Sequence, residues 1–135
     1  MRLLSANDIR SVFSARDAVE AVKIAFRMAV QGKCESPLRT NIQAPGYDGC
    51  FLFMPAYAPE LDAAVLKNIN IFPQNIEKGI PTSQAQILLI DGKTSVVSAV
   101  LDGACVTQLR TGGASGAAFD LLGRPDAREG ALIGT

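Results

Sequence analysis

The chain has 135 residues, of which 48% are apolar and 19% charged, so it can bury one ordinary core and is too short for two. Its 13 basic and 13 acidic residues cancel, and neither sign forms a block, which argues against nucleic acid or an anionic membrane surface as a partner. The sequence has no histidine, which excludes histidine-based nucleophilic pairs, general bases and zinc ligands from this chain.

The cysteines and the apolar segments indicate the cellular compartment of the protein. Cys34, Cys50 and Cys105 are widely spaced and form no Cys-x-x-Cys pair, which favours reduced thiols over a disulfide framework or a metal site. No stretch approaches the roughly 20 apolar residues of a membrane helix, and the N-terminus lacks the apolar core of a signal peptide. We therefore expect a cytoplasmic protein whose partners are small molecules or another protein.

Two helix starts are predicted near the N-terminus, because Ser5 and Ser14 each precede an aspartate by three residues. From Arg16 onward, apolar residues recur at three- and four-residue steps as far as Val30. Gly32 is well placed to end this second helix.

After Pro37 the sequence changes to short apolar runs separated by Gly, Pro and Asp, which is typical of strands. Turn residues between the last two runs, at 91–94, predict a hairpin. The predicted strands are Leu38–Ile42, Gly49–Tyr57, Ala63–Phe72, Ala85–Ile90 and Ser95–Leu101.

A further helical segment is predicted to begin near Asp102, to restart after Thr111 and to end at Gly123. A linker over 124–130 then leads to an apolar, strand-like run at 131–135. An apolar run that reaches a glycine is how a dinucleotide-binding domain begins, so this ending suggests a fragment.

Lys67 is a charged residue within a predicted strand. The two-residue period of a strand places Lys67 on the same face as Val65, Ile69 and Ile71. A buried, unpaired ammonium is costly, so Lys67 needs an acidic partner, a route to solvent or an anionic ligand. The simplest explanation is an edge strand whose lysine reaches out to solvent.

The segment from Arg110 to Gly116 allows two interpretations. In one, Thr111 caps a new helix whose exposed glycine amides favour an anion, and Arg110 adds a forked donor. In the other, Gly112, Gly113 and Gly116 only permit close packing of helices. The glycine spacing matches neither a Walker nor a Rossmann loop.

Several short motifs occur in one order along the chain, and together they resemble the ornithine cyclodeaminase and mu-crystallin family from about Leu4 to the last residue. The resemblance implies an α+β substrate-binding and dimerisation domain over residues 1–123, with N-terminal helices packed on a mixed, largely antiparallel sheet. It also implies that residues 124–135 are the linker and first strand of a truncated dinucleotide-binding domain. The motifs are Pro37 with Arg39, Met54-Pro55, Lys67-Asn68-Ile69-Asn70, Leu101-Asp102-Gly103 and Thr107-Gln108-Leu109-Arg110-Thr111.

The family resemblance also implies a reaction, which is hydride transfer between NAD or NADP and the α-carbon of an amino acid or its imine. Arg39, Lys67 and Arg110 match positions that hold the substrate carboxylate, and Lys67 also matches the catalytic position that assists proton movement. Thr82 matches a threonine that contacts the cofactor. The position of Arg110 is also implied to contact the cofactor. The implied partners are an amino-acid, keto-acid or cyclic-imine substrate and a second copy in a homodimer, with no metal.

Two departures from the family pattern affect these expectations. Ornithine-specific members have an acidic residue just before Met-Pro, whereas Cys50-Phe51-Leu52-Phe53 is apolar. We therefore expect alanine dehydrogenase or ketimine or pyrroline-2-carboxylate reductase activity in preference to ornithine cyclodeamination. Gly112-Gly113 stands where the family commonly has alanines, at a cost of roughly 1 kcal/mol per glycine in a helix.

The resemblance assigns the acid/base aspartate and most cofactor contacts to the dinucleotide-binding half. The 135-residue chain alone is therefore expected to be inactive and to bind no cofactor tightly. One alternative is a non-catalytic, mu-crystallin-like protein for ligand binding or dimerisation. Another is a chain that ends at Thr135 and acts as a dimer-forming remnant.

Overall fold

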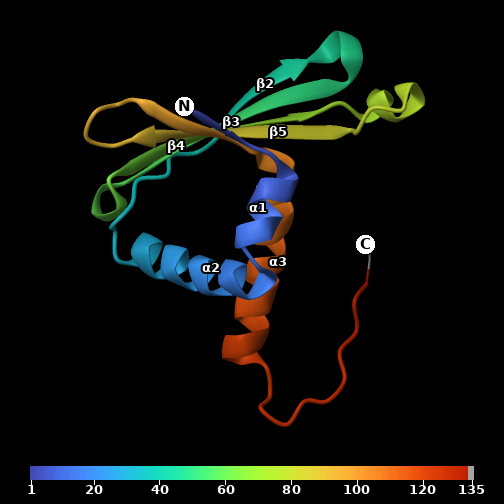
Figure 1. The fold of residues 1–135 in the computed structure, drawn as a ribbon. Coiled ribbons are helices and arrows are strands. Elements are labelled where there is room, and N and C mark those ends of the chain that lie inside the picture. The colour runs from blue at the N-terminus through green and yellow to red at the C-terminus, as the bar shows by residue number, and fades with distance from the viewer. Residues whose placement is uncertain (134–135) are drawn as a thin grey trace.

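The computed structural model describes residues 1–133, which form one six-stranded sheet with helices on one side of it (Figure 1). The helices are α1 (Ala6–Val12), α2 (Ala15–Val30) and α3 (Gly103–Leu122). The strands are β1 (Arg2–Leu4), β2 (Thr40–Ala44), β3 (Gly49–Ala58), β4 (Ala63–Ile71), β5 (Ser83–Asp91) and β6 (Val97–Asp102). Short 3-10 turns join β2 to β3, β3 to β4 and β4 to β5, and they are η1 (Pro45–Tyr47), η2 (Pro59–Leu61) and η3 (Pro73–Lys78).

The sheet has the order β1-β6-β5-β4-β3-β2. Strands β2 to β6 form an antiparallel meander, and β1 pairs with β6 in parallel, so the predicted α+β class with a mixed, largely antiparallel sheet is confirmed. Strand β1 was not predicted from the sequence. Strand β4 is internal, so the explanation of Lys67 as an edge-strand lysine is wrong.

The predicted strands correspond to β2 through β6. The largest shift is in β2, which begins at Thr40 and ends at Ala44, two residues later than predicted at each end. The predicted hairpin of β5 and β6 is confirmed. Its turn is held by Asp91, whose Oδ1 accepts hydrogen bonds from the amides of Lys93 and Thr94 at 3.1 and 2.8 Å.

Both predicted helix starts are confirmed as capping boxes. Ser5 accepts from the amide of Asp8 while the Asp8 carboxylate accepts from Ser5, and Ser14 and Asp17 repeat the arrangement. Helix α2 ends at Val30, shortly before Gly32, whose φ of 66° lies in the left-handed region that favours glycine.

Helix α3 is continuous, so the predicted restart at Thr111 is wrong. The Thr111 hydroxyl donates to the Thr107 carbonyl at 2.7 Å within the helix and caps nothing. Because the amides that follow lie in the helix interior, they form no anion site. The packing interpretation holds instead for Gly113, where an added Cβ would lie 2.7 Å from the Ala18 carbonyl oxygen of α2, and for Gly116, where it would lie 2.6 Å from Val19.

Residues 131–133, where the sequence predicts the start of a strand, have no strand assignment in the described structure. A strand needs a neighbour to bond its backbone, and no strand of the described chain pairs with this segment. Gly134 and Thr135 lie outside the described residues. The division into parts at residues 123 and 124 stays a prediction.

We predict that the two adjacent glycines of α3 respond oppositely to alanine. Gly113→Ala should lower the free energy of unfolding by roughly 1 to 3 kcal/mol, since the new methyl meets the α2 backbone. Gly112→Ala, with nothing within 4 Å of its Cβ, should raise stability by up to about 1 kcal/mol. Urea denaturation followed by circular dichroism measures both. An equal effect of the two substitutions would refute the packing role assigned to Gly113.

Candidate functional site

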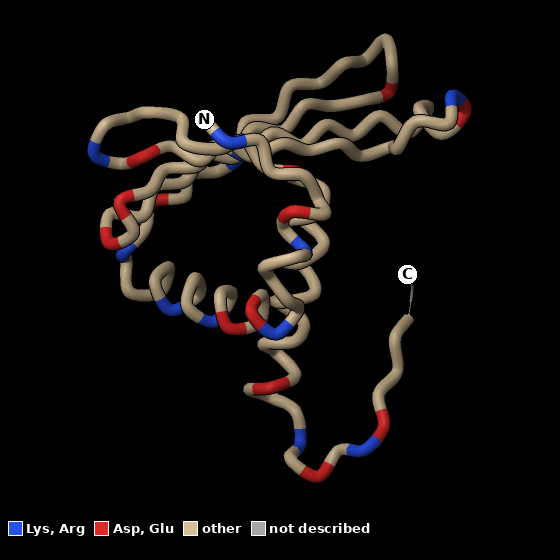
Figure 2. Tube along the Cα trace, viewed as in Figure 1, with Lys and Arg blue, Asp and Glu red and all other residues tan. Residues whose placement is uncertain are grey.

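Lys67 lies at the centre of the sheet, in β4, between Met54 of β3 and Ile87 of β5. It is half-buried, and it is the one basic residue in strands β3 to β6. Most charged residues lie instead on the helices and the loops (Figure 2). Its Nζ donates a hydrogen bond of 2.7 Å to Thr107 Oγ1 of α3, so the ammonium points toward the helix side of the sheet.

The start of α3 is fixed tightly against the sheet, and this brings Thr107 to Lys67. Asp102 caps the helix by accepting from the Cys105 amide at 2.8 Å. At Gly103 an added Cβ would lie 2.7 Å from the Ala85 carbonyl carbon of β5, so only glycine allows this close approach. Thr107, one turn further on, donates to the Gly103 carbonyl at 2.5 Å.

The site brings together two positively charged side chains, those of Lys67 and Arg110. Burial lowers the pKa of Lys67 below its ordinary value of 10.5, and the nearby positive charge of Arg110 lowers that pKa further. None of the ion pairs found among residues 1–133 includes Lys67 or Arg110. Of the three ways to stabilise Lys67, an acidic partner is therefore absent from the described chain, and an anionic ligand suits the arrangement.

Arg110 also borders a hollow of about 490 Å³ between α1, α2, α3 and the ends of β1 and β6. The lining is almost entirely apolar, and its one acidic residue, Asp8, is already hydrogen-bonded to Ser5. No ion pair between Asp8 and Arg110 occurs in the described structure. Arg110 itself is exposed.

Arg39 is exposed and stands one residue before β2. Thr40, the first residue of β2, pairs with Phe53, and the next residue of β3, Met54, pairs with Lys67. Arg39 therefore approaches the row of the sheet that contains Lys67. No hydrogen bond or ion pair of the described residues joins Arg39 to Lys67 or to Arg110, so the convergence of the three cations stays a prediction.

Thr82 lies elsewhere on the sheet. It is exposed just before β5, and its carbonyl accepts from the Phe72 amide at 2.8 Å. Ile87, the partner of Lys67, is five residues further along the strand, which separates the two sites by about 17 Å. The structure does not bring Thr82 to Lys67, and the cofactor role of Thr82 stays a prediction.

Thr107 contacts Lys67, and the sequence alone did not single it out as a candidate site residue. The available signal was its spacing, four residues after Gly103 and three before Arg110, which places all three along one side of a helix. In the described residues no group of histidine, cysteine, aspartate or glutamate side chains is arranged to hold a metal ion.

The chain belongs to the Ornithine cyclodeaminase/mu-crystallin family, whose sequence profile matches residues 1–135. It is 30% identical over 135 residues to a Delta(1)-pyrroline-2-carboxylate reductase of Bacillus cereus, with all of this chain and 42% of that protein covered. It is 33% identical over 132 residues to an alanine dehydrogenase of Archaeoglobus fulgidus, with 98% of this chain and 40% of that protein covered.

A solved structure has the same fold. Delta(1)-pyrroline-2-carboxylate reductase of Thermococcus litoralis, in complex with NADH and L-proline, matches with a TM-score of 0.89 and 38% identity over 95% of this chain and 40% of that chain. The chain thus spans about two fifths of the length of its relatives, with 42% and 40% covered in the two curated proteins. Among the helices of the described residues, none is both long and apolar enough to span a membrane.

We predict that Lys67→Met raises the free energy of unfolding at neutral pH. Because the native pKa of Lys67 is depressed, the folded state binds this proton less firmly than the unfolded state does. The wild type should therefore gain stability as the pH rises from the native pKa of Lys67 toward 10.5. Above that pH, the difference in unfolding free energy between the variant and the wild type should vanish. Denaturant titrations at several pH values measure this difference.

Lys93→Met is the matched control, because Lys93 is 71% exposed and pairs with Asp62 at the surface. It should give no gain in stability at neutral pH. If Lys67→Met were destabilising at every pH, the electrostatic cost assigned to Lys67 would be refuted.

Proposed function

We propose that the chain is the substrate-binding part of an NAD(P)-dependent oxidoreductase acting at the α-carbon of an amino acid or imine. The observation that carries the proposal is the pair of cations, Lys67 and Arg110, which share no carboxylate in the described structure. A substrate carboxylate would neutralise both charges and fix the orientation of the α-carbon. Support comes from the T. litoralis relative, whose structure contains L-proline and NADH.

In this proposal Arg39, Lys67 and Arg110 hold the carboxylate, and Lys67 also moves a proton at the substrate nitrogen. The lowered pKa of Lys67 favours this second role, because it increases the neutral fraction of the amine near neutral pH. The nicotinamide, when bound, supplies or accepts the hydride. Thr82 is available to such a cofactor, since its side chain is exposed and makes no hydrogen bond within the described residues.

The surroundings of Lys67 favour an apolar or cyclic substrate over ornithine. Its neighbours on the same face include Met54, Leu52 and Ile87. The nearest acidic residue along β5 on that face, Asp91, is four residues from Ile87, at about 13 Å. Along β5, a second substrate ammonium would find no carboxylate closer than that of Asp91. We therefore propose alanine dehydrogenase or ketimine or pyrroline-2-carboxylate reductase activity before ornithine cyclodeamination.

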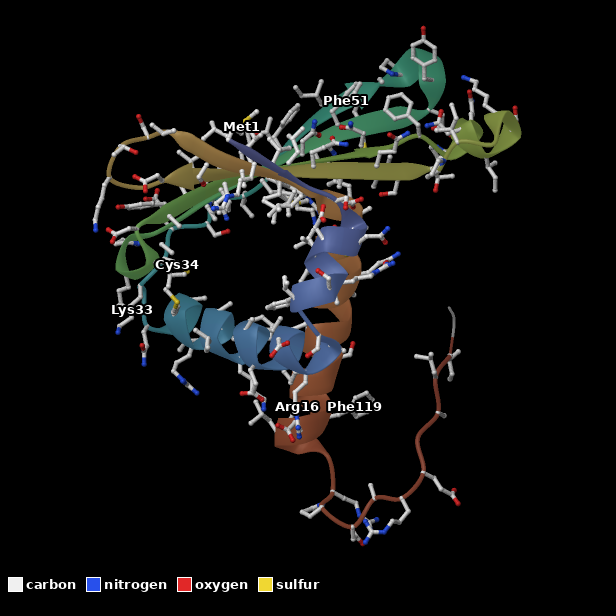
Figure 3. All side chains as sticks on the ribbon, in the orientation of Figure 1. Met1, Arg16, Lys33, Cys34, Phe51 and Phe119 are labelled. Carbon is white, nitrogen blue, oxygen red and sulfur yellow. The ribbon has the colours of Figure 1, made fainter. Side chains whose placement is uncertain are left out.

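We also propose that the chain forms a homodimer through the sheet face that lacks helices. Strand alternation places Phe51 and Leu66 on the face opposite to Lys67, and Figure 3 shows Phe51 on the side away from the helices. A row of apolar residues crosses five strands on this face, and a second sheet is its natural cover. An archaeal alanine dehydrogenase that is 33% identical to this chain has the structure of a dimer with bound NAD. The row is Leu3, Val100, Leu88, Leu66 and Pro55.

We predict that L-proline binds the chain and that Arg110→Gln weakens this binding by on the order of 10- to 100-fold, as expected for a lost hydrogen bond to a charged group. Lys67→Met and Arg39→Gln should act in the same direction. Chemical-shift titration by NMR measures the affinities. Prolinamide, which lacks the carboxylate, should bind neither the wild type nor the variants.

Arg124→Gln is the matched control, because Arg124 pairs with Asp126 after α3 and should not affect proline. Equal binding of proline and prolinamide would contradict the carboxylate site. A second assay distinguishes an enzyme from a binding protein. It measures oxidation of NADH or NADPH by the protein including any residues after Thr135. The substrates are cyclic imines, or keto acids together with ammonia. The 135 residues alone should show no turnover and no tight binding of either cofactor.

We predict that Leu88→Arg converts the dimer to a monomer, because it places a charge at the centre of the apolar row. Val96→Arg is the matched control, since Val96 lies in the β5–β6 turn and is 60% exposed. Analytical ultracentrifugation measures the oligomeric state of both variants, and circular dichroism confirms that each is folded. A wild-type chain that sediments as a monomer at all concentrations would exclude this interface.

A further inference from the structure

The Lys67 side chain has one hydrogen-bond partner in the described structure, the Thr107 hydroxyl at 2.7 Å. The proton of that hydroxyl is already committed, because Thr107 donates it to the Gly103 carbonyl at 2.5 Å. Toward Lys67, Thr107 therefore presents lone pairs and acts only as an acceptor. A threonine in a helix has two accessible rotamers, and a hydrogen bond from its hydroxyl to the carbonyl four residues earlier favours one of them.

A neutral acceptor has a different effect on a lysine from that of a carboxylate. It fixes the direction of one N–H bond without adding a negative charge, so the positive charge of Lys67 remains available to an anion. When Lys67 is neutral, it can still donate one N–H to Thr107, and its lone pair must then point elsewhere. The same contact thus orients Lys67 in both of its protonation states.

We propose that Thr107 is a positioning residue that directs the Lys67 amine toward the substrate carboxylate and the nitrogen that exchanges a proton. This inference rests on the proposed function and adds a residue that acts through Lys67. Gly103 and the Asp102 cap support it, because they set how closely α3 approaches β5 and hence how far Thr107 lies from Lys67.

The test compares Thr107→Val, which keeps the shape and removes the hydroxyl, with Thr107→Ser, which keeps the hydroxyl. The pKa of Lys67 is measured by NMR of the lysine Nζ in the 135-residue chain. The valine variant should lower this pKa further, because a hydrogen bond that favours the charged form is lost. The serine variant should restore the wild-type value. Arg110 is the other charged group acting on Lys67 and is unchanged in both variants.

L-proline affinity is the second measurement, and it should fall on the order of tenfold in Thr107→Val and recover in Thr107→Ser. Ser115→Ala is the matched control, since Ser115 also bonds a carbonyl four residues earlier on α3, that of Thr111. It should change neither measurement. If Thr107→Val fails to fold, Thr107→Ala is judged by the same criteria.

The outcomes separate this inference from the proposed function. An unchanged Lys67 pKa in Thr107→Val, or a failure of serine to restore it, overturns the positioning role. A wild type that does not bind proline overturns the proposed carboxylate site, while the pKa comparison still decides whether Thr107 orients Lys67. A lowered pKa with rescue by serine, together with loss of proline affinity, supports both.

Discussion

The hydrogen bond from Lys67 to Thr107 joins the centre of the sheet to α3, and the candidate site depends on it. It exists because Gly103 lets the first turn of α3 lie directly on the β5 backbone at Ala85. Any side chain at position 103 would move the helix outward and carry Thr107 away from Lys67. One steric constraint therefore sets both the packing of α3 and the geometry of the site.

The site carries an electrostatic cost that the fold does not offset. Lys67 is half-buried among apolar neighbours, Arg110 adds a like charge, and neither cation forms an ion pair within the described residues. The chain as a whole has no net charge, so this imbalance is local. Groups that lower stability in this way are expected where a ligand supplies the missing charge, because binding then recovers the lost free energy.

Much of the fold could be predicted from local patterns, whereas contacts distant in sequence could not. Ser5 and Ser14 cap α1 and α2 locally, the apolar periodicity adds to the signal for α2, and the turn at Asp91 determines the last hairpin. Strand β1 is only three residues long and pairs with β6, so no local signal exists for it. Thr111 was misassigned because a threonine hydroxyl can bond backbone either as a cap or within a helix. Periodicity placed Lys67 on an apolar face, but its partner Thr107 is 40 residues away.

Side chains alternate along β4, so neighbouring residues of this strand face opposite sides of the sheet. Lys67 faces the helices and Thr107, while Leu66 faces the uncovered side with Leu88. A second copy packed on the uncovered face would therefore cover Leu66 without covering the Lys67 amine. Likewise, a ligand bound at Lys67 would leave the apolar row unchanged. The two proposed functions of the sheet are compatible because a strand has two faces, and a substitution on one face tests one of them alone.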